Sequence, residues 1–590
     1  MLWQKESDAS NATYIDLCTP SSPKEIKEFE RAISLYDERM QNSVEKNFVA
    51  SKDNDLSLKL RREGNALFTN KKWDQAMDKY NRSLCYAEKG SEQIALAYAN
   101  RSSCYLYMKM YDKCLVDIDL ARKANYPEYL EPKLNKRAAD CVKSIDDGLQ
   151  AIDGEAKLSY ESHQNYPGLV EHLVIVNSSK HGRGVFATKD VDVGETVLLE
   201  RMYVGESFVR KYETCTVCLK SNTNLAPCST CTFAMLCYDG CNCADLHRLE
   251  CGIRSHPNNG DDFVLGILIS VIRSILMAMK LFSNTDDLMC FVEEAIAADP
   301  MEIPLTVDDK STYRSFLKIH KEELTDARPH HIHFFYRYLA GNTELASHFS
   351  EEKHRRFYMH LIMHHLAVVK SNKITSERLV GNVLPAGLNA LDYVYEDESI
   401  GILKTYFNHS CAPNIAFYCD NGCIIGKIIR PVKNGEQLFC SYFPNLLGLT
   451  WDDRRGMNDF GFECDCFRCE SGVTDNTDFH IDPAFGFNGD YLYLRANFSP
   501  NRSYPEEPIR KAVEEKCVTL LKKFGRNKWT YSLEYVMQAY VAALQRSSTS
   551  PISKYLYLEN IVHKHGLNHN VDLFEQDFRQ KLTSLFSCLF

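Results

Sequence analysis

Cysteine pairs at metal-ligand spacing constrain the fold of this chain more than any other feature of its sequence. Residues 215–251 contain two such pairs, Cys215 with Cys218 and Cys228 with Cys231. The gap of two residues lets both sulfurs of a pair reach one tetrahedral zinc ion. Two later pairs complete two closed sites, which are expected to be structural because they leave no open coordination position. The later pairs are Cys237 with Cys241 and His247 with Cys251; Cys243 is the alternative to Cys241, although we favour Cys241.

The order of these ligands resembles that of the MYND zinc finger, a module that binds other proteins. The resemblance implies interleaved metal binding, in which the first and third pairs share one ion and the second and fourth pairs share the other. One zinc would be held by Cys215, Cys218, Cys237 and Cys241, and the other by Cys228, Cys231, His247 and Cys251.

The length, charge and cysteine content of the chain indicate its general class. With 590 residues the chain is too long for one hydrophobic core, so several domains are expected. The net charge of −10 argues against bulk nucleic-acid binding, because phosphate affinity depends on a local excess of Lys and Arg. The first residues, MLWQKESDAS, lack the regions of a signal peptide, which predicts a location in cytoplasm and nucleus. There, 23 cysteines indicate thiols and metal sites rather than disulfides.

Residues 254–385 are mostly helical in pattern and are expected to form a buried insert. The most apolar stretch, residues 263–282, carries Arg273 and Lys280. A charge near the centre of a bilayer costs roughly 3 kcal/mol, so we interpret this stretch as a core helix and expect no membrane contact. Histidines in the insert are adjacent rather than at ligand spacing and are interpreted as core or surface side chains: His330, His331, His333, His364 and His365.

Residues 55–155 repeat a two-helix pattern. Small and aromatic residues recur in LRREGNALFTNKKWDQAMDKYNRSL and in YANRSSCYLYMKMYDKCLVDIDLARKANYP, and a third unit begins at EPKLNKRAADC. The pattern resembles the tetratricopeptide repeat, of which at least three are usually needed to bury a continuous core. The recurring positions are Leu60, Gly64, Leu67, Ala76, Tyr80 and Ser83, then Tyr98, Ser102, Tyr105, Cys114 and Ala121.

Polar residues on the first helix of each repeat suggest a peptide-binding face. They fall where repeats of the carboxylate-clamp type grip the acidic C-terminal tail of a chaperone. Three cations and two amides on one concave face would complement a terminal carboxylate and its neighbouring acids. The alternative is an ordinary solvated helix face. The residues are Arg61, Asn65, Asn100, Lys133 and Arg137.

Strands are expected on both sides of the cysteine cluster. The stretch VIVNSSKHGRGVFATKDVDVGETVLLE alternates like strands around Gly182, Gly184 and Gly194, and GCIIGKIIRPVKNGEQLFCSYF predicts two strands joined by the turn KNGE. The following FECDCFRC supplies three thiolates, one short of a zinc tetrahedron.

Four motifs in order, GRG, NHSC, GEQLFCSY and CDCFRC, with a MYND-like finger after the first, resemble the SET and MYND family of protein lysine methyltransferases. The resemblance covers roughly residues 165–475, and the helical repeats resemble those of the family member with amino-terminal tetratricopeptide repeats. It implies that Cys411 of NHSC supplies the missing ligand, so that about three zinc ions are expected. The third set would be Cys411, Cys464, Cys466 and Cys469.

The same resemblance assigns the remaining site residues. S-adenosyl-L-methionine would lie against residues 181–184, with amide and imidazole contacts from NHSC. Tyr442 would line the channel for the substrate lysine and position the reacting groups. Phe460 stands where family members often have Tyr, which leaves the activity open. The cofactor set is His181, Gly182, Arg183, Gly184, Asn389, Asn408, His409, Tyr442, Phe460 and Phe462.

We therefore expect a multidomain α+β protein. Its predicted parts are a polar segment 1–54, a tetratricopeptide array 55–155, an N-terminal SET part 165–212, a MYND finger 213–253, a helical insert 254–385, a SET core 386–446, a post-SET zinc site 447–475 and a C-terminal helical domain 495–590. The expected function is S-adenosyl-L-methionine-dependent methylation of a lysine in a histone or non-histone protein. The alternative is a non-enzymatic adaptor with a structural SET core.

Overall fold

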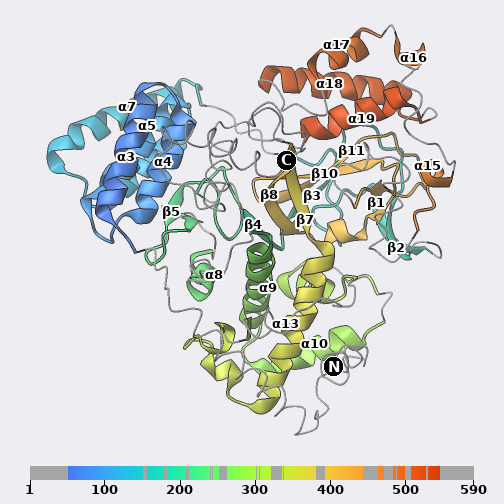
Figure 1. Cartoon of the computed structure of the whole chain (residues 1–590), viewed down its shortest axis with the longest axis horizontal. Coiled ribbons are helices and arrows are strands. Elements are labelled where there is room, and N and C mark those ends of the chain that lie inside the picture. The colour runs from blue at the N-terminus through green and yellow to red at the C-terminus, as the bar shows by residue number, and fades with distance from the viewer. Residues whose placement is uncertain are drawn as a thin grey trace, which may run out of the picture.

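In the computed structural model, helical segments surround a β-rich centre (Figure 1). A helical array flanks this centre on one side, a helical insert lies at one end, and C-terminal helices cover another face. The described residues are 51–150, 156–178, 180, 182–207, 212–238, 241, 243–251, 262–299, 302–304, 306–320, 335–336, 338–379, 393–442, 454, 463–470, 483–486, 488–498, 507–526 and 529–544.

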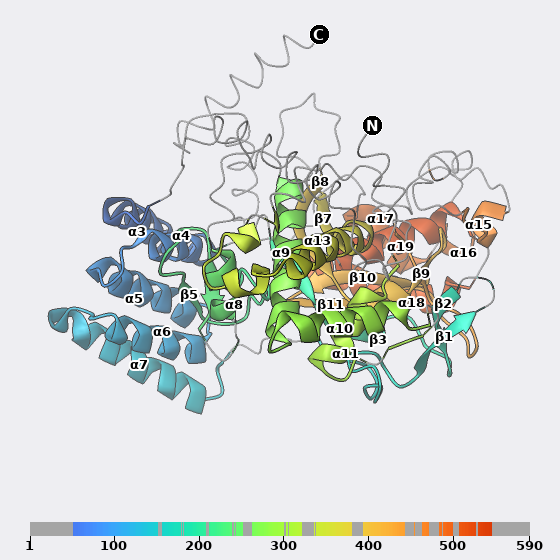
Figure 2. The ribbon, with the colours of Figure 1, turned by 90° about the horizontal axis from the view of Figure 1, so that it is seen from below.

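The N-terminal array consists of helices that each pack on the next (Figure 2). Helix α3 begins where Asp53 accepts hydrogen bonds from the amides of Asp55 and Leu56. Gly64 is required inside α3, because a Cβ there would lie 2.5 Å from the ring of Tyr80. The helices are α3 (Asn54–Thr69), α4 (Trp73–Tyr86), α5 (Glu92–Tyr107), α6 (Tyr111–Lys123) and α7 (Glu131–Asp146), with the short helix η2 (Glu128–Leu130) before α7. The sequence prediction of a helical array is confirmed.

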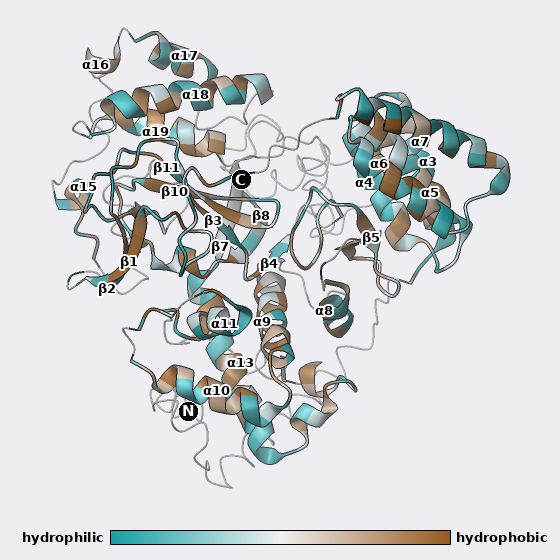
Figure 3. Ribbon diagram, turned by 180° about the vertical axis from the view of Figure 1, so that it is seen from behind, coloured by the Kyte–Doolittle hydropathy of each residue, from teal (hydrophilic) through white to brown (hydrophobic). Residues whose placement is uncertain are grey.

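The β-rich centre is assembled from small sheets whose strands come from distant parts of the chain. Strand β3 (Thr196–Arg201) pairs with β11 (Cys423–Ile428), which also pairs with β10 (Ile415–Asp420). Strand β1 (Leu173–Ser178) pairs with β2 (Gly182–Ala187). Strand β1 is coloured as hydrophobic in Figure 3, and its residues Leu173 and Ile175 join the buried core of this region.

The stretch GCIIGKIIRPVKNGEQLFCSYF forms two strands, but they do not make the expected hairpin. Strand β11 pairs with β3 and β10, whereas β12 (Phe439–Cys440) pairs in parallel with β9 (Asn408–His409). The turn at Gly435 has a φ of 85°, which suits glycine, but it sends the chain to a different sheet. Local turn chemistry therefore predicted the reversal but not the partner strand.

The helical insert follows the cysteine-rich residues 212–251, named the zinc-binding segment after their candidate metal ligands. Its helices enclose one hydrophobic core, and the expected core helix α9 is buried along most of its described length. No single helix in the described ranges is long and apolar enough to cross a membrane; α9 and α10 pass that test only as a pair bent by 109°. The elements are α9 (Asp262–Lys280), α10 (Thr285–Ala297), α11 (Asp309–Leu317), η4 (Ala346–Phe349) and α13 (Glu352–Asn372).

The insert ends earlier in the structure than the sequence suggested. Residues 374–379, assigned to the insert, form strand β7 (Ile374–Leu379), which pairs with β8 (Tyr393–Ile400). Strand β8 also pairs with β4 (Val204–Ser207), so this sheet joins both halves of the β-rich centre.

The C-terminal helices pack on the β-rich centre. Their core includes Val193 and Ile429 from the strand region, and Arg430 donates a hydrogen bond to the carbonyl of Gly525 at 2.9 Å. The helices are α15 (Phe467–Glu470), α16 (Pro483–Gly486), α17 (Gly489–Asn497), α18 (Glu507–Phe524) and α19 (Tyr531–Leu544).

Candidate active site and metal centres

The NHSC corner is built by the parallel pairing of β9 with β12. This pairing aligns Asn408 with Phe439 and His409 with Cys440, two residues before Tyr442. The short helix η5 (Leu403–Tyr406) leads directly into the corner. Residues more than thirty positions apart in the sequence are therefore side by side here, as the motif resemblance implies.

Asn408 connects the corner to the GRG stretch on β2. Its side-chain amide donates to the carbonyl of Arg183 at 3.0 Å. Gly184 must be glycine, because a Cβ at this position would lie 3.1 Å from Asn408 Nδ2 and closer still to Gln437. The packing of the Asn408 and Gln437 side-chain amides against β2 explains the second glycine of GRG.

The side chain of Arg183 contacts the helical insert. Its guanidinium donates to the carbonyl of Lys318 at 2.8 Å and lies over the ring of Tyr406, 5.5 Å from the centroid. In this structure Arg183 therefore anchors β2 to the insert and to η5.

His409 lies between the metal-ligand cysteines and Tyr442. Its Nε2 is 3.5 Å from the sulfur of Cys411, and its Nδ1 accepts a hydrogen bond from the main-chain amide of Tyr442 at 3.1 Å. The His409 and Tyr442 rings are 5.4 Å apart. Both ring nitrogens thus have protein partners, so the imidazole connects the cysteine cluster to Tyr442, a role that the expected cofactor contact did not include.

Tyr442 packs against the core of the β-rich centre. Burial raises the pKa of its hydroxyl above the ordinary value. The hydroxyl therefore stays protonated at neutral pH and can donate a hydrogen bond.

The third cysteine cluster lies beside this corner. The sulfurs of Cys411, Cys464, Cys466 and Cys469 all lie within 4.8 Å of one another. Four thiolates at this separation are the ligand set of a structural zinc site. Arg468, which the sequence reading did not single out, is buried and donates to the carbonyl of Cys411 at 3.0 Å. The only sign of this role in the sequence is that Arg468 stands between two of the ligand cysteines.

Two more ligand clusters lie in the zinc-binding segment, residues 212–251. One cluster contains five cysteines, and the other has the composition expected from the sequence. In the second cluster the Cys231 sulfur is 3.4 Å from His247 Nε2, and the Cys228 and Cys251 sulfurs are 3.9 Å apart. The clusters are Cys215, Cys218, Cys237, Cys241 and Cys243, and Cys228, Cys231, His247 and Cys251.

The five-cysteine cluster contains both candidates for the fourth ligand, Cys241 and Cys243. Cys243, the first residue of α8 (Cys243–Glu250), forms thiol contacts with Cys215, Cys218 and Cys237. Thiol contacts with Cys218, and then with Cys237 and Cys243, lower the pKa of Cys215. The start of α8 turns the Cys243 side chain into the cluster. Both Cys241 and Cys243 lie within 4.8 Å of the other ligands, so our preference for Cys241, made from spacing, stays a prediction, with Cys243 as the alternative.

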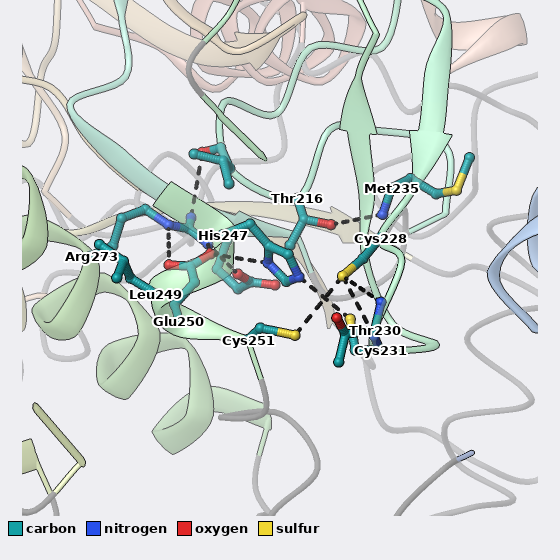
Figure 4. A network of polar contacts seen from close by, with 12 residues as sticks. Thr216, Cys228, Thr230, Cys231, Met235, His247, Leu249, Glu250, Cys251 and Arg273 are labelled. Carbon is teal, nitrogen blue, oxygen red and sulfur yellow. Dashed lines mark hydrogen bonds and ion pairs between the residues drawn. The ribbon is translucent and has the colours of Figure 1, made fainter. Parts of the chain in front are cut away.

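A buried ionic network connects the His247 cluster to the insert (Figure 4). His247 Nδ1 is 3.7 Å from Glu250, and Glu250 accepts two hydrogen bonds from Arg273 of α9, at 2.6 and 2.9 Å. Burial acts to raise the pKa of Glu250, but the nearby Arg273 charge keeps it below the ordinary value. The ionised carboxylate can orient the histidine ring, as carboxylates beside zinc ligands commonly do.

The polar residues of the helical array are partly occupied by contacts within the array. Asn100 donates to Asn65 Oδ1 at 2.8 Å, and Arg61 lies 3.3 Å from the side-chain oxygen of Gln93. Arg137 donates to the carbonyl of Ala99 and to Ser102. Lys133 is exposed. The structure thus brings Asn65 and Asn100 together but directs Arg137 to the backbone of α5.

The array and the zinc-binding segment share one hydrophobic core, a feature that the sequence did not indicate. Arg101 is fully buried, pairs with Asp117 at 2.6 Å and donates to the carbonyl of Leu225 at 2.8 Å. Asn224 donates to the same Asp117 at 2.8 Å. Leu225 belongs to the hairpin of β5 (Leu225–Pro227) and β6 (Met235–Cys237), so the interface reaches the metal ligands directly.

Other expected residues lie in the insert or outside the described parts of the chain. The Nε2 of His364 donates a hydrogen bond to the carbonyl of Leu317 at 3.0 Å, and His365 contacts Ser274 and Tyr313. Both are buried core side chains, as the sequence indicated. The residues outside the described parts are His181, Asn389, Phe460 and Phe462, with the histidines His330, His331 and His333.

The sequence of the chain is similar to a known domain family and to known proteins in the region of this site. The SET domain family matches residues 182–443. The chain is 25% identical over 248 residues to protein-lysine N-methyltransferase SMYD4 of Danio rerio, covering 38% of this chain and 32% of the relative. It is 25% identical over 354 residues to SMYD4 of Mus musculus, covering 48% and 43%.

A third relative is the SET domain and MYND-type zinc finger protein 6 of Schizosaccharomyces pombe, 24% identical over 301 residues, with 50% of this chain and 51% of the relative covered. The chain thus matches about a third to a half of the length of these relatives. These comparisons assign residues 182–443 to a SET domain, and the chain as a whole is similar to SET and MYND domain proteins, in keeping with the NHSC corner and the cysteine clusters.

Proposed function

We propose that this chain is a protein-lysine N-methyltransferase that uses S-adenosyl-L-methionine. The observation that carries the proposal is the NHSC corner, where Asn408 contacts the main chain of Arg183 and His409 contacts the main chain of Tyr442. The relatives named as protein-lysine N-methyltransferases support the same activity. When bound, the cofactor supplies a methyl group on a sulfonium ion.

The residues of the chain would bind and position the two reactants. The carboxamide of Asn408 and the backbone of residues 182–184 offer donors and acceptors for the polar end of the cofactor. The Tyr442 hydroxyl, protonated because burial raises its pKa, would hold the acceptor lysine in line. The lysine must lose its proton before its nitrogen attacks, and a dry site with a nearby positive charge favours the neutral amine.

The cysteine clusters would hold three structural zinc ions. The cluster at Cys411 would fix the corner, because Cys411 follows His409 by two residues and its carbonyl is bound by Arg468. The other clusters fit a MYND finger, with Cys241 or Cys243 as the fourth ligand of the first. In a closed thiolate site the metal organises the chain and leaves the transfer chemistry to other residues.

The decisive experiment compares cofactor binding with methyl transfer in Tyr442→Phe. Only the hydroxyl is removed, so cofactor affinity by calorimetry should change little, whereas transfer of radiolabelled methyl groups to a histone mixture or cell extract should fall roughly ten- to thousandfold. Tyr160→Phe is the matched control, because Tyr160 is also a partly buried tyrosine packed on the same core. Equal transfer by wild type and Tyr442→Phe would reject the mechanism.

Asn408→Ala tests the cofactor side of the site. Its cofactor affinity should drop by about 1 to 3 kcal/mol if a buried polar partner is left unpaired. A wild-type protein that binds no cofactor at all would favour the adaptor function instead.

The helical array is proposed as a tetratricopeptide array that binds an acidic peptide tail. The adjacent amides of Asn65 and Asn100 and the exposed Lys133 support this partner. Lys133→Ala should weaken binding of an acidic C-terminal peptide roughly tenfold, since a charged hydrogen bond contributes about 1.5 to 3 kcal/mol. Lys136→Ala, an exposed neighbour on the same helix, is the control. Equal effects of the two variants would point to a general charge effect.

A further inference from the structure

A buried carboxylate on β3 holds the turn that leads into the NHSC corner. Glu200 is 7% exposed. Its two oxygens accept hydrogen bonds from the main-chain amides of Leu403 at 2.7 Å and Lys404 at 3.0 Å. These amides belong to the first turn of η5, whose donors have no partner within so short a helix. A side chain two hundred residues earlier therefore caps this helix.

The turn is shaped to admit the carboxylate. A Cβ at Gly401 would lie 2.5 Å from Glu200 Oε2 and 2.5 Å from Ile424 Cδ1. Gly401 thus leaves the space that Glu200 occupies, and Ile424 closes the apolar side of the pocket. The space beside Gly401 and Ile424 therefore fits the carboxylate of Glu200.

The capped turn carries side chains to both sides of the candidate active site. Lys404 places its ammonium 5.7 Å from the ring centroid of Tyr442. Tyr406 receives the guanidinium of Arg183 over its ring. Strand β9 begins at Asn408, two residues after the end of η5. Displacement of the turn would therefore move contacts to both Tyr442 and the GRG stretch.

We propose that Glu200 is a positioning residue for methyl transfer, because its carboxylate fixes the turn that aligns Lys404 and Asn408 with the Tyr442 corner. The role rests on the proposed function. Glu200 does not contact the corner itself; it acts through η5 and the start of β9. None of the site residues predicted from the sequence was expected to have this role.

The ionisation of Glu200 gives this role a measurable signature. Burial raises the pKa of Glu200 to about 7, against the opposing effect of the amide hydrogen bonds and of Lys404. The titratable groups facing the carboxyl are Lys404 and Tyr406 on η5. Because the pKa is raised in the closed turn, the closed turn binds the proton more tightly than an opened turn, so the turn should loosen as the pH rises through about 7.

The test measures amide exchange and cofactor binding in the full chain with its zinc. Glu200→Ala removes both acceptors, and exchange of the Leu403 and Lys404 amides should accelerate roughly tenfold or more. Glu200→Gln keeps one acceptor and a similar shape, so it should fold even if the alanine variant does not, and its exchange should be intermediate. Glu195→Gln, a half-buried carboxylate just before β3, is the matched control.

The pH profile separates positioning from simple support. Cofactor affinity of wild type should fall as the pH is raised through about 7, whereas Glu200→Gln, which cannot ionise, should show a flatter profile. Unchanged exchange in both Glu200 variants, or parallel pH profiles, would overturn the role of Glu200 while leaving the proposed function intact. A wild type that binds no cofactor at any pH would overturn the proposed function and, with it, the positioning role.

Discussion

Asp117→Ala is expected to loosen the helical array from the zinc-binding segment. Asp117 is fully buried and accepts two hydrogen bonds from Arg101, at 2.6 and 2.7 Å, and one from Asn224 at 2.8 Å. The substitution leaves the Arg101 guanidinium buried without its counter-charge. Arg101 keeps its hydrogen bonds to the neutral oxygens of Asn81 and Leu225 and its position over the rings of Tyr98 and Tyr105, none of which carries a negative charge.

The expected loss is about 3 to 5 kcal/mol, the usual cost of removing one partner of a buried ion pair. Loss of the hydrogen bond from Asn224 to Asp117 adds little to this cost, because Asn224 also donates to the carbonyl of Lys113 at 2.9 Å and keeps that partner. An exposed pair gives the comparison. Arg122 and Glu131 also pair at 2.7 Å, but their side chains are 39% and 29% exposed, so Arg122→Met should cost less than about 1 kcal/mol.

Hydrogen exchange followed peptide by peptide is the suitable assay, because a chain with several domains does not unfold in one transition. In Asp117→Ala, amides of α5, α6 and the β5–β6 hairpin should exchange faster by roughly a hundredfold or more, while those of α18 and α19 should not change. Chelation of zinc should accelerate the same array peptides, because the hairpin carries metal ligands. An effect no larger than that of Arg122→Met would refute the reasoning.

Three further predictions concern single side chains. Burial raises the pKa of Glu200 from 4.5 to about 7, so its contribution to stability is fully present below about pH 4.5 and is lost as the pH rises through about 7. Urea midpoints should decline over this pH window less steeply in Glu200→Gln than in wild type. Equal slopes for the two proteins would contradict the assignment. Cys241→Ser should remove about one of three zinc ions by elemental analysis and Cys243→Ser none, whereas the opposite result would identify Cys243 as the ligand. Arg273→Met leaves Glu250 buried without its cation and should weaken zinc retention against a chelator roughly ten- to hundredfold, and unchanged retention would show that the network does not support the metal.

Most metal ligands could be predicted from their spacing in the sequence, whereas Cys411, far from Cys464 in the chain, was assigned only through the family resemblance. Thiol and imidazole ligands at gaps of two to four residues are local patterns, and few other structures require them. The exception is the choice between Cys241 and Cys243, which spacing left open with a preference for Cys241. The orientation of Cys243 depends on where α8 begins, and a helix start is a boundary that local patterns locate poorly.

Contacts between distant residues could not be predicted in this way. Glu200 reads as an ordinary residue near the end of a strand, and only the packing of β3 beside η5 shows that it caps a helix two hundred positions later. Likewise, the imidazole of His409 could have faced a cofactor, but the parallel pairing of β9 with β12 gives its nitrogens two protein partners.

By itself the sequence determined which thiolates can hold metal and which segments form helices, and the family resemblance indicated which motifs meet at the NHSC corner. These properties follow from short-range spacing and from the nature of each side chain. The tertiary structure decided which groups share a buried environment. It joined Arg101 to the zinc-binding hairpin and Glu200 to η5. A buried charge needs a partner of matching geometry, and that partner is chosen by the packing of whole elements rather than by neighbours in the chain.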